Sequence, residues 1–353
     1  MSPEYQTDDV RIDGLRPLIP PAILMEEFPA TEAVRARVAQ HREELSRVLS
    51  GEDDRLLCVV GPCSIHDPEA ALEYADKLQA TADELRDDLL VVMRVYFEKP
   101  RTIIGWKGLI NDPHLDGSFA INEGLRRARR FLLDIIALGL PAGSEFLDPI
   151  SPQFYADLVA WGAIGARTSE SQVHREVASG LSMPVGFKNG TDGTVQLAVD
   201  AIRSSAHPHH FLSVTKQGVA AVVATKGNPE CHVILRGGTS GPNHHEKDVL
   251  EVAATLEAAG VPGRVMIDCS HANSGKNHEN QPAVAAEVAE QIAKGARNIF
   301  GVMVESFLIG GNQDHTKVDT LEYGKSITDK CLGWSETDTV LRGLADSVRK
   351  RRG

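Results

Sequence analysis

Basic residues that could bind phosphate are concentrated in one irregular stretch of this sequence, Arg94 to Gly117. The stretch follows the apolar run 89–93 and holds four lysines or arginines and one histidine. Its segment from Lys99 to Thr102 combines two cations with a hydroxyl group. Guanidinium groups bind phosphate and carboxylate through paired hydrogen bonds, and ammonium adds a compact charge. The composition favours a phosphate-binding loop, although a solvated surface loop with a positive bias would look the same.

Eight short runs rich in valine, isoleucine and leucine alternate with helical patterns, and each run leads into a charged or reactive residue. These residues are Cys63, Arg94, Glu145, Arg167, Lys188, Arg236, His271 and Glu305. Continuous apolar strands are expected where both faces of a parallel sheet are covered, and eight strand–helix units over about 250 residues match a (β/α)8 barrel. We therefore predict an α/β fold, a TIM barrel with its reactive groups at the C-terminal strand ends. A doubly wound open sheet is the alternative, but no GxGxxG pattern follows any run.

The reactive residues divide into two sets by the ligands that they prefer. One set combines a thiolate, an imidazole and carboxylates, which suits a divalent transition metal. Its members are Cys63, His271 and Glu305, with an acid from a later loop such as Asp329. The other set is cationic and favours a small phosphorylated, carboxylated substrate. Its members are Arg94, Lys99, Arg167, Lys188 and Arg236, with Arg101 and Thr102 available for a second phosphate.

Simpler explanations exist for each of these residues taken alone. Cys63 could be a small strand residue, Asp329 a helix cap, and one buried charge a structural ion pair. Four cations at one rim, however, would be strongly destabilising without an anionic ligand. The set as a whole therefore indicates a functional site.

The region before the barrel, residues 1–52, is expected to form an N-terminal arm and helix that serve assembly or regulation. Prolines favour an extended arm over 1–29. Thr31 as N-cap and Gly51 as stop predict one helix after it. Residues 53–353 are then the catalytic barrel.

An additional segment lies between the fifth and sixth predicted strands, at about 207–231. It contains two β-like runs around Gln217 and Gly218 and predicts an inserted hairpin outside the helical ring. Insertions of this kind serve assembly or regulation more often than chemistry.

The overall composition restricts the partners and the compartment. The 37 lysines and arginines minus 49 acids give a net charge of −12, so the average surface repels nucleic acid and anionic membranes. Five widely spaced cysteines without a CxxC pair favour a reducing compartment. No apolar run reaches the length of about 18 residues that a membrane helix needs, and no leader pattern opens the sequence. We expect a cytoplasmic protein.

Motifs along nearly the whole chain resemble those of the 3-deoxy-D-arabino-heptulosonate 7-phosphate (DAHP) synthases, type I alpha class. The motifs are GPCSIHDP (61–68), RVYFEKPRT (94–102), GSEFLDP (143–149), WGAIGARTSESQVHRE (161–176), GFKNGTDG (186–193), ILRGG (234–238), IDCSHANSGK (267–276), VMVES (302–306) and SITDKC (326–331).

The resemblance implies a metal-dependent transferase of the shikimate pathway, which joins phosphoenolpyruvate and D-erythrose 4-phosphate with water to give DAHP and phosphate. Matched residue by residue, it implies the metal ligands Cys63, His271, Glu305 and Asp329 and the catalytic residues Lys99, Cys63 and His271. The implied phosphoenolpyruvate site is Arg94, Lys99, Glu145, Gly165, Ala166, Arg167, Lys188 and Arg236. The implied erythrose 4-phosphate site is Lys99, Pro100, Arg101 and Thr102. Mn²⁺ is favoured, but Fe²⁺, Co²⁺ and Zn²⁺ accept the same ligands.

The same resemblance implies feedback inhibition by an aromatic amino acid. The matching effector positions are Asp8, Asp9, Asp148, Pro152, Gln153, Leu181, Ser182, Phe211, Ser213 and Val223. Serine at position 213 favours phenylalanine, with tyrosine next. A homodimer or homotetramer is expected, because an arm without its own core tends to cross to another subunit.

Three other functions are compatible with parts of the pattern. A Schiff-base aldolase could use Lys188 to form an imine with a carbonyl substrate. A 3-deoxy-octulosonate 8-phosphate synthase shares the barrel and the phosphoenolpyruvate chemistry, but resembles this chain far less. A barrel without activity could instead bind an effector for a partner enzyme such as chorismate mutase.

Overall fold

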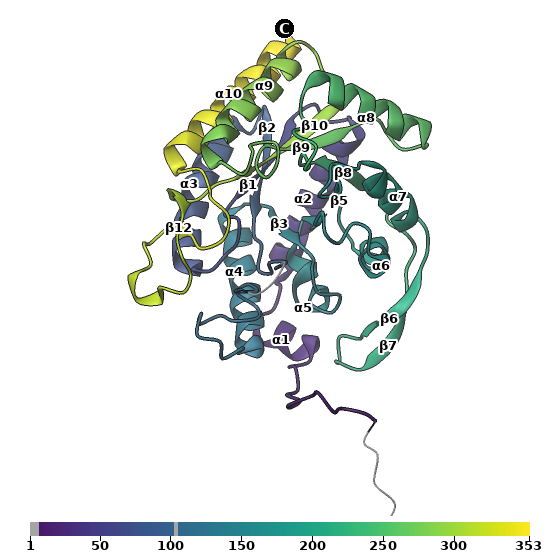
Figure 1. The fold of residues 1–353 in the computed structure, drawn as a ribbon, viewed down its shortest axis with the longest axis vertical. Coiled ribbons are helices and arrows are strands. Elements are labelled where there is room, and N and C mark those ends of the chain that lie inside the picture. Colours follow the sequence, from purple (N-terminus) through teal and green to yellow (C-terminus); the bar gives the residue numbers. More distant parts are fainter. Residues whose placement is uncertain (1–6, 102–104) are drawn as a thin grey trace, which may run out of the picture.

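The computed structural model describes residues 7–101 and 105–353, and it contains the predicted eight-stranded parallel barrel (Figure 1). The strands close in the order β1-β10-β9-β8-β5-β4-β3-β2. Their bounds are β1 Leu56–Gly61, β2 Leu89–Arg94, β3 Ala142–Glu145, β4 Trp161–Ile164, β5 Val185–Lys188, β8 Cys231–Leu235, β9 Val265–Asp268 and β10 Ile299–Glu305. All eight predicted runs therefore form barrel strands, and the TIM-barrel prediction is confirmed.

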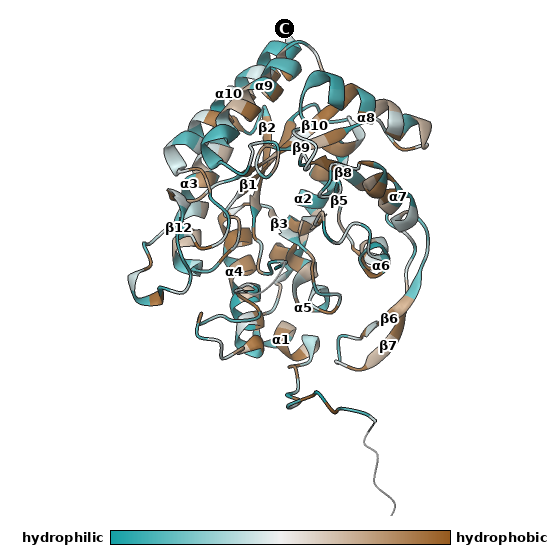
Figure 2. Ribbon diagram, in the orientation of Figure 1, coloured by the Kyte–Doolittle hydropathy of each residue, from teal (hydrophilic) through white to brown (hydrophobic). Residues whose placement is uncertain are grey.

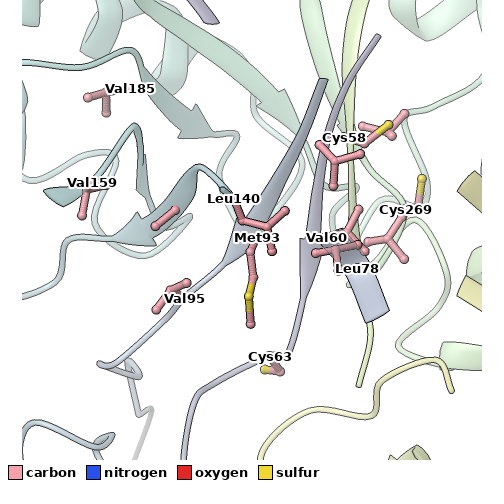
Figure 3. Close-up of a cluster of buried hydrophobic side chains, with 14 of the residues drawn as sticks. Cys58, Val60, Cys63, Leu78, Met93, Val95, Leu140, Val159, Val185 and Cys269 are labelled. Atoms are coloured by element: carbon pink, nitrogen blue, oxygen red, sulfur yellow. The ribbon is translucent and has the colours of Figure 1, made fainter. Parts of the chain in front are cut away.

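Every residue of these strands is buried, because side chains on one face fill the barrel and those on the other contact the helices. Along β1, Leu57 and Val59 belong to the interior cluster, whereas Cys58 and Val60 belong to the cluster under the helices. Figure 3 shows part of this second cluster, with Cys63 in the loop that follows β1. In Figure 2 the central strands are predominantly hydrophobic.

Helices surround the barrel and cover the outer faces of the strands (Figure 1). Their bounds are α3 Pro68–Leu85, α4 Ile121–Leu138, α5 Pro152–Tyr155, α6 Gln172–Gly180, α7 Gln196–Ser205, α8 Glu246–Ala258, α9 Gln281–Ala293 and α10 Trp334–Arg352. Short 3₁₀ turns lie at Ala156–Leu158, His278–Asn280 and Val318–Thr320. In the long loop before α10, β11 (Ile309–Asn312) pairs with β12 (Lys325–Ser326). No helix among the described residues is long and apolar enough to cross a membrane.

The predicted helix after the arm is α2, Glu32–Ser50. Thr31 caps it by accepting a hydrogen bond from the backbone NH of Val34, and Gly51 ends it at φ +88°, a conformation that glycine adopts without strain. Leu45 and Val48 belong to the same buried cluster as the barrel interior. Helix α2 therefore contributes to the core of the barrel.

The arm before α2 is not wholly extended as expected. Pro21 begins a short helix, α1 (Pro21–Glu27), because a proline at the first helical position loses no hydrogen bond that the helix would need. Leu24 of this helix belongs to the buried cluster under the barrel helices. The division into an arm region, residues 1–52, and a barrel remains a prediction.

The predicted inserted hairpin is present as β6 (His210–Val214) and β7 (Ala220–Ala224), which pair antiparallel. Figure 1 shows it beyond α6 and α7, outside the helical ring. Its outer side chains Leu212 and Val222 are 84% and 69% exposed. The backbone NH of Ala22 donates to the carbonyl of Lys216 in the hairpin turn, which joins the arm to the hairpin.

Candidate functional site

A cavity of about 910 Å³ lies at the C-terminal ends of the barrel strands. Six of the eight predicted reactive residues line it, namely Glu145, Arg167, Lys188, Arg236, His271 and Glu305. The other two, Cys63 and Arg94, are fully buried. Parallel strands in a barrel end at the same rim, so residues more than a hundred positions apart meet here.

Three predicted metal ligands present their donor atoms to one another beside this cavity. One ligand atom from each of Cys63, Glu305 and Asp329 lies within 4.8 Å of the other two. The Cys63 sulfur donates to Oδ2 of Asp329 across 3.4 Å. Nε2 of the fourth predicted ligand, His271, lies 3.9 Å from Oε1 of Glu305. The structure therefore brings all four together.

Strand register and one backbone contact explain this convergence. Gly61, two residues before Cys63, pairs with Glu305 across adjacent strands β1 and β10. Asp329 comes from the loop before α10. Leu332 in this loop attaches it to β10, because its backbone NH donates to the carbonyl of Glu305 at 2.9 Å. The distant Asp329 is thereby brought beside the strand ends.

Asp268, at the end of β9, orients the histidine of this cluster. Its Oδ2 lies 2.9 Å from Nδ1 of His271, which leaves Nε2 of the same ring facing Glu305. The same Asp268 oxygen also accepts a hydrogen bond from the Lys188 ammonium at 2.9 Å. Burial alone would raise the pKa of Asp268, but the charges of His271 and Lys188 hold it well below its usual value. We did not single out Asp268 from the sequence. The available signal was a lone carboxylate within the apolar run RVMIDCSH.

The chemistry of this donor set fits a divalent transition cation. Sulfur, imidazole nitrogen and carboxylate oxygen together match the preferences of such ions, and the carboxylate behind His271 is the usual outer partner of a metal-binding histidine. Burial, with a further effect of Glu305, raises the pKa of the Cys63 thiol to about 12. A cation bound beside the sulfur would reverse that shift by stabilising the thiolate.

Lys99 extends from the loop after β2 into the same cluster. Its ammonium donates to the sulfur of Cys63 at 3.0 Å and to the Cys63 carbonyl at 3.3 Å. Burial alone would lower the pKa of Lys99, but the electrostatic effects of Cys63, Asp329 and Glu305 outweigh that effect and raise it. Lys99 also lines the cavity, so its ammonium group faces both the donor cluster and the cavity.

Arg94 lies beneath the cavity rather than in its wall. Its Nη2 donates to Oε1 of Glu305 at 3.0 Å, its Nη1 donates to the sulfur of Met303 at 2.9 Å, and its guanidinium lies 3.8 Å from the centre of the Tyr96 ring. These contacts fix the Glu305 carboxylate. Contact between Arg94 and a substrate remains a prediction.

The remaining cations surround the opposite part of the cavity. Lys188 is paired with Asp268, whereas Nη1 of Arg236 donates to the carbonyl oxygen of Gly237 at 3.4 Å. Burial lowers the pKa of Arg236, and the charge of Arg167 acts in the same direction. Among the described residues, neither Arg167 nor Arg236 forms a salt bridge, so two arginines that face one cavity can bind an anion.

The other predicted substrate residues also reach the cavity. Gly165 and Ala166 line it, and a side chain at position 165 would place its Cβ 2.3 Å from Oε1 of Glu145, so only glycine leaves Glu145 in position. Pro100 and Arg101 line the same cavity. Thr102 lies outside the described residues.

A second cavity, of about 700 Å³, contains four of the predicted effector residues: Pro152, Gln153, Leu181 and Ser182. Basic residues that we did not predict share its wall: Arg35, Arg42, Arg129 and Lys216. The other predicted effector residues are not among its lining residues. Phe211, Ser213 and Val223 lie on the hairpin, Asp148 follows β3, and Asp8 and Asp9 belong to the exposed part of the arm. Their roles remain predictions.

A family comparison agrees with this arrangement over most of the chain. The sequence profile of the DAHP synthetase I family matches residues 29–342. The chain belongs to this family.

Individual members of the DAHP synthetase I family match nearly end to end. The Phe-sensitive phospho-2-dehydro-3-deoxyheptonate aldolase of Escherichia coli K12 is 60% identical, with 99% of each chain covered. The tyrosine-inhibited enzyme of Schizosaccharomyces pombe is 56% identical, covering 98% of this chain and 94% of the relative. A solved phospho-2-dehydro-3-deoxyheptonate aldolase from Francisella tularensis SCHU S4 is 54% identical with a TM-score of 0.95, covering 97% of this chain and 100% of that one.

Proposed function

We propose that this chain is a DAHP synthase, which condenses phosphoenolpyruvate with D-erythrose 4-phosphate and water to give DAHP and phosphate. One observation carries the proposal: a cluster of thiol, imidazole and carboxylate groups borders the cavity that Lys99, Lys188, Arg167 and Arg236 line. Such a cavity suits two anionic substrates that would otherwise repel each other. Much of the rate acceleration then comes from holding them in contact.

Different cationic side chains bind the two substrates. Arg167, Lys188 and Arg236 bind the phosphate and carboxylate of phosphoenolpyruvate, because guanidinium groups pair with both groups and ammonium adds charge. Lys99, Pro100 and Arg101, together with Thr102, receive erythrose 4-phosphate. Lys99 belongs to both sets because its ammonium group lies at the donor cluster and in the cavity wall.

We assign the metal site to Cys63, His271, Glu305 and Asp329, with Mn²⁺ as the favoured ion. When bound there, a divalent cation supplies Lewis-acid polarisation of the erythrose 4-phosphate aldehyde. Asp268 holds Nδ1 of His271 and so keeps Nε2 directed at the cluster.

Bond formation joins C3 of phosphoenolpyruvate to the aldehyde carbon, and negative charge develops on the aldehyde oxygen. The buried Lys99 ammonium is positioned to stabilise that charge. Water then adds at C2, and phosphate leaves by cleavage of the C–O bond. Arg167 and Arg236 neutralise the charge of the leaving phosphate.

The test is a coupled assay of phosphoenolpyruvate consumption. Turnover is expected with erythrose 4-phosphate and a divalent metal, and it should fall to background with excess chelator and return when metal is restored. Full activity in chelator would contradict the metal assignment, and no consumption with any divalent metal would contradict the reaction.

An imine mechanism at Lys188 is disfavoured by one contact. Lys188 is one half of an ion pair with Asp268, and an ammonium group has no lone pair with which to attack a carbonyl. Borohydride treatment in the presence of each substrate separates the two mechanisms. Covalent labelling of Lys188 would overturn our assignment.

We further propose that the second cavity binds an aromatic amino acid, phenylalanine in preference to tyrosine. Its wall combines apolar side chains such as Leu181 and Met183 with the cations Arg42 and Lys216, which suits an aromatic ring and a carboxylate. Measuring activity against phenylalanine, tyrosine and tryptophan separately tests this. Indifference to all three would remove the regulatory assignment.

We propose a homodimer or homotetramer that uses the arm and the hairpin. Leu15 in the arm and Leu212 in the hairpin are each 84% exposed, and burial of such side chains against another subunit is favourable. Light scattering at micromolar concentration gives the assembly. A monomer would contradict the proposal. Binding to a chorismate mutase remains a prediction from the resemblance.

We place the protein in a reducing compartment, the cytoplasm. All five cysteines are unpaired and buried.

A further inference from the structure

Two adjacent histidines and a glutamate form a second cluster of possible metal ligands, away from the cavity at the strand ends. His244 and His245 immediately precede α8, and Glu287 lies on α9. One ligand atom from each lies within 4.8 Å of the other two. Nε2 of His244 is 3.2 Å from Oε2 of Glu287, and Nδ1 of His245 is 2.5 Å from Oε1.

The donor set is one that proteins use for zinc-type cations. Two imidazoles and one carboxylate leave further coordination positions for water, as in open three-ligand sites. The cluster is also partly open to solvent, because the side chains of His245 and Glu287 are 48% and 41% exposed while His244 is buried. A hydrated ion can therefore enter from the surface and keep some of its water.

The positions of the three side chains are already constrained without an ion. The two imidazole rings lie 4.3 Å apart between centroids. The side-chain amide of Gln291, one turn beyond Glu287 on α9, donates to the carbonyl of His244 at 2.9 Å. This bond attaches the loop to α9 independently of the imidazoles. Little rearrangement is needed to direct both imidazoles and the carboxylate at one ion.

We propose that His244, His245 and Glu287 bind a second divalent transition cation, of the zinc type, which joins the start of α8 to α9. The loop that carries the histidines begins at Arg236, and Asn243 within it accepts a hydrogen bond from the backbone NH of Gly237 at 2.7 Å. The ion therefore anchors the same loop that supplies an arginine to the active-site cavity.

The two sites should differ in their affinity for the metal ion. Nδ1 of His271 is held by Asp268, but Nδ1 of His244 is buried without a hydrogen-bond partner among the described residues. Loss of such an outer partner weakens metal binding by about 10–100-fold. The His244–His245–Glu287 cluster should therefore bind its ion second, with a dissociation constant at least about tenfold higher than that of the first site.

Cobalt(II) distinguishes the sites, because a cobalt–thiolate bond absorbs in the near ultraviolet and a site with only nitrogen and oxygen ligands does not. The untagged full chain is stripped with chelator, dialysed and titrated with Co²⁺, and bound metal per chain is measured beside the absorption band. The wild-type chain should bind two ions, of which only the first produces the band. Binding of a single ion by the wild type would overturn the proposal.

Variants assign each ion to its cluster. His245→Ala should bind one ion with the full band, whereas Cys63→Ala should lose the band and keep the step that belongs to the histidine pair. Exposed His207→Ala is the matched control and should still bind two. Glu287→Gln keeps the side-chain shape and should weaken binding of the second ion by at least tenfold. This variant replaces His245→Ala if that variant fails to fold. Two ions in both His245→Ala and Glu287→Gln would refute the assignment.

Discussion

Arg94 donates to Oε1 of Glu305 across 3.0 Å, and neither side chain is more than 2% exposed. The pair joins the ends of β2 and β10 at the cavity, which Glu305 lines. Arg94 thus holds in place a carboxylate that we assign to the metal. Removal of the guanidinium would leave that carboxylate buried without its partner.

Arg94→Ala is therefore expected to destabilise the metal-free chain by about 3–5 kcal/mol, the usual cost of an unpaired buried charge. Arg94→Lys keeps the positive charge but loses the planar guanidinium group, so it should lower the free energy of unfolding by less. Urea unfolding of the chelator-treated proteins measures both. A loss below about 1 kcal/mol in Arg94→Ala would show that the pair does not stabilise the fold.

Cys63→Ala should abolish metal-dependent turnover, because it removes the only sulfur donor of the assigned site. Cys58→Ala is the matched control, since Cys58 is another fully buried cysteine of the same β1 region but lies under the helices. Its expected cost is a small loss of stability of about 1 kcal/mol with turnover retained. Equal activities of the two variants would argue against the thiol as a ligand.

Asp268→Asn should weaken metal binding at the first site by about 10–100-fold, because the amide no longer provides a negative charge behind His271. It also breaks the ion pair with Lys188, so KM for phosphoenolpyruvate should change as well. Isothermal titration with Mn²⁺ measures the affinity. Asp338→Asn, on the partly exposed surface of α10, is the control and should leave the affinity unchanged.

Glu98, next to Lys99, predicts a specific pH dependence of stability. Burial, with the nearby charge of Asp148 acting in the same direction, raises the pKa of Glu98 from 4.5 to about 7 despite a hydrogen bond from Ser151 at 2.8 Å. The folded chain thus holds a proton that the unfolded chain has released between these values. The contribution of Glu98 is fully present below pH 4.5 and is lost as the pH rises through about 7.

Glu98→Gln should remove that dependence, since the amide is neutral throughout. The difference in unfolding free energy between wild type and variant should change by about 3 kcal/mol over this window, with the wild type losing stability as the pH rises. Urea unfolding at several pH values, from about 5 to about 8, gives the two curves. Parallel curves would mean that Glu98 titrates normally in the folded chain.

Much of the fold could be predicted from the sequence because its signals are local. Thr31 and Gly51 define α2 by their capping chemistry, and the two runs around Gln217 and Gly218 define the hairpin. The reactive residues at the ends of eight apolar runs predicted one shared rim, because parallel strands in a closed barrel all point the same way. Three of the four assigned metal ligands and most of the cationic residues lie at these strand ends, whereas Asp329 comes from a later loop.

Only the tertiary structure decided which of these charges contact one another. The sequence placed Arg94 among the substrate cations, and only the tertiary structure shows that it also pairs with Glu305. Asp268 was hidden in an apolar run, and its function depends on where Lys188 and His271 lie around it. His244 and Glu287 are separated by a whole helix in the chain. Side-chain contacts between distant segments depend on packing in three dimensions, which no local pattern encodes.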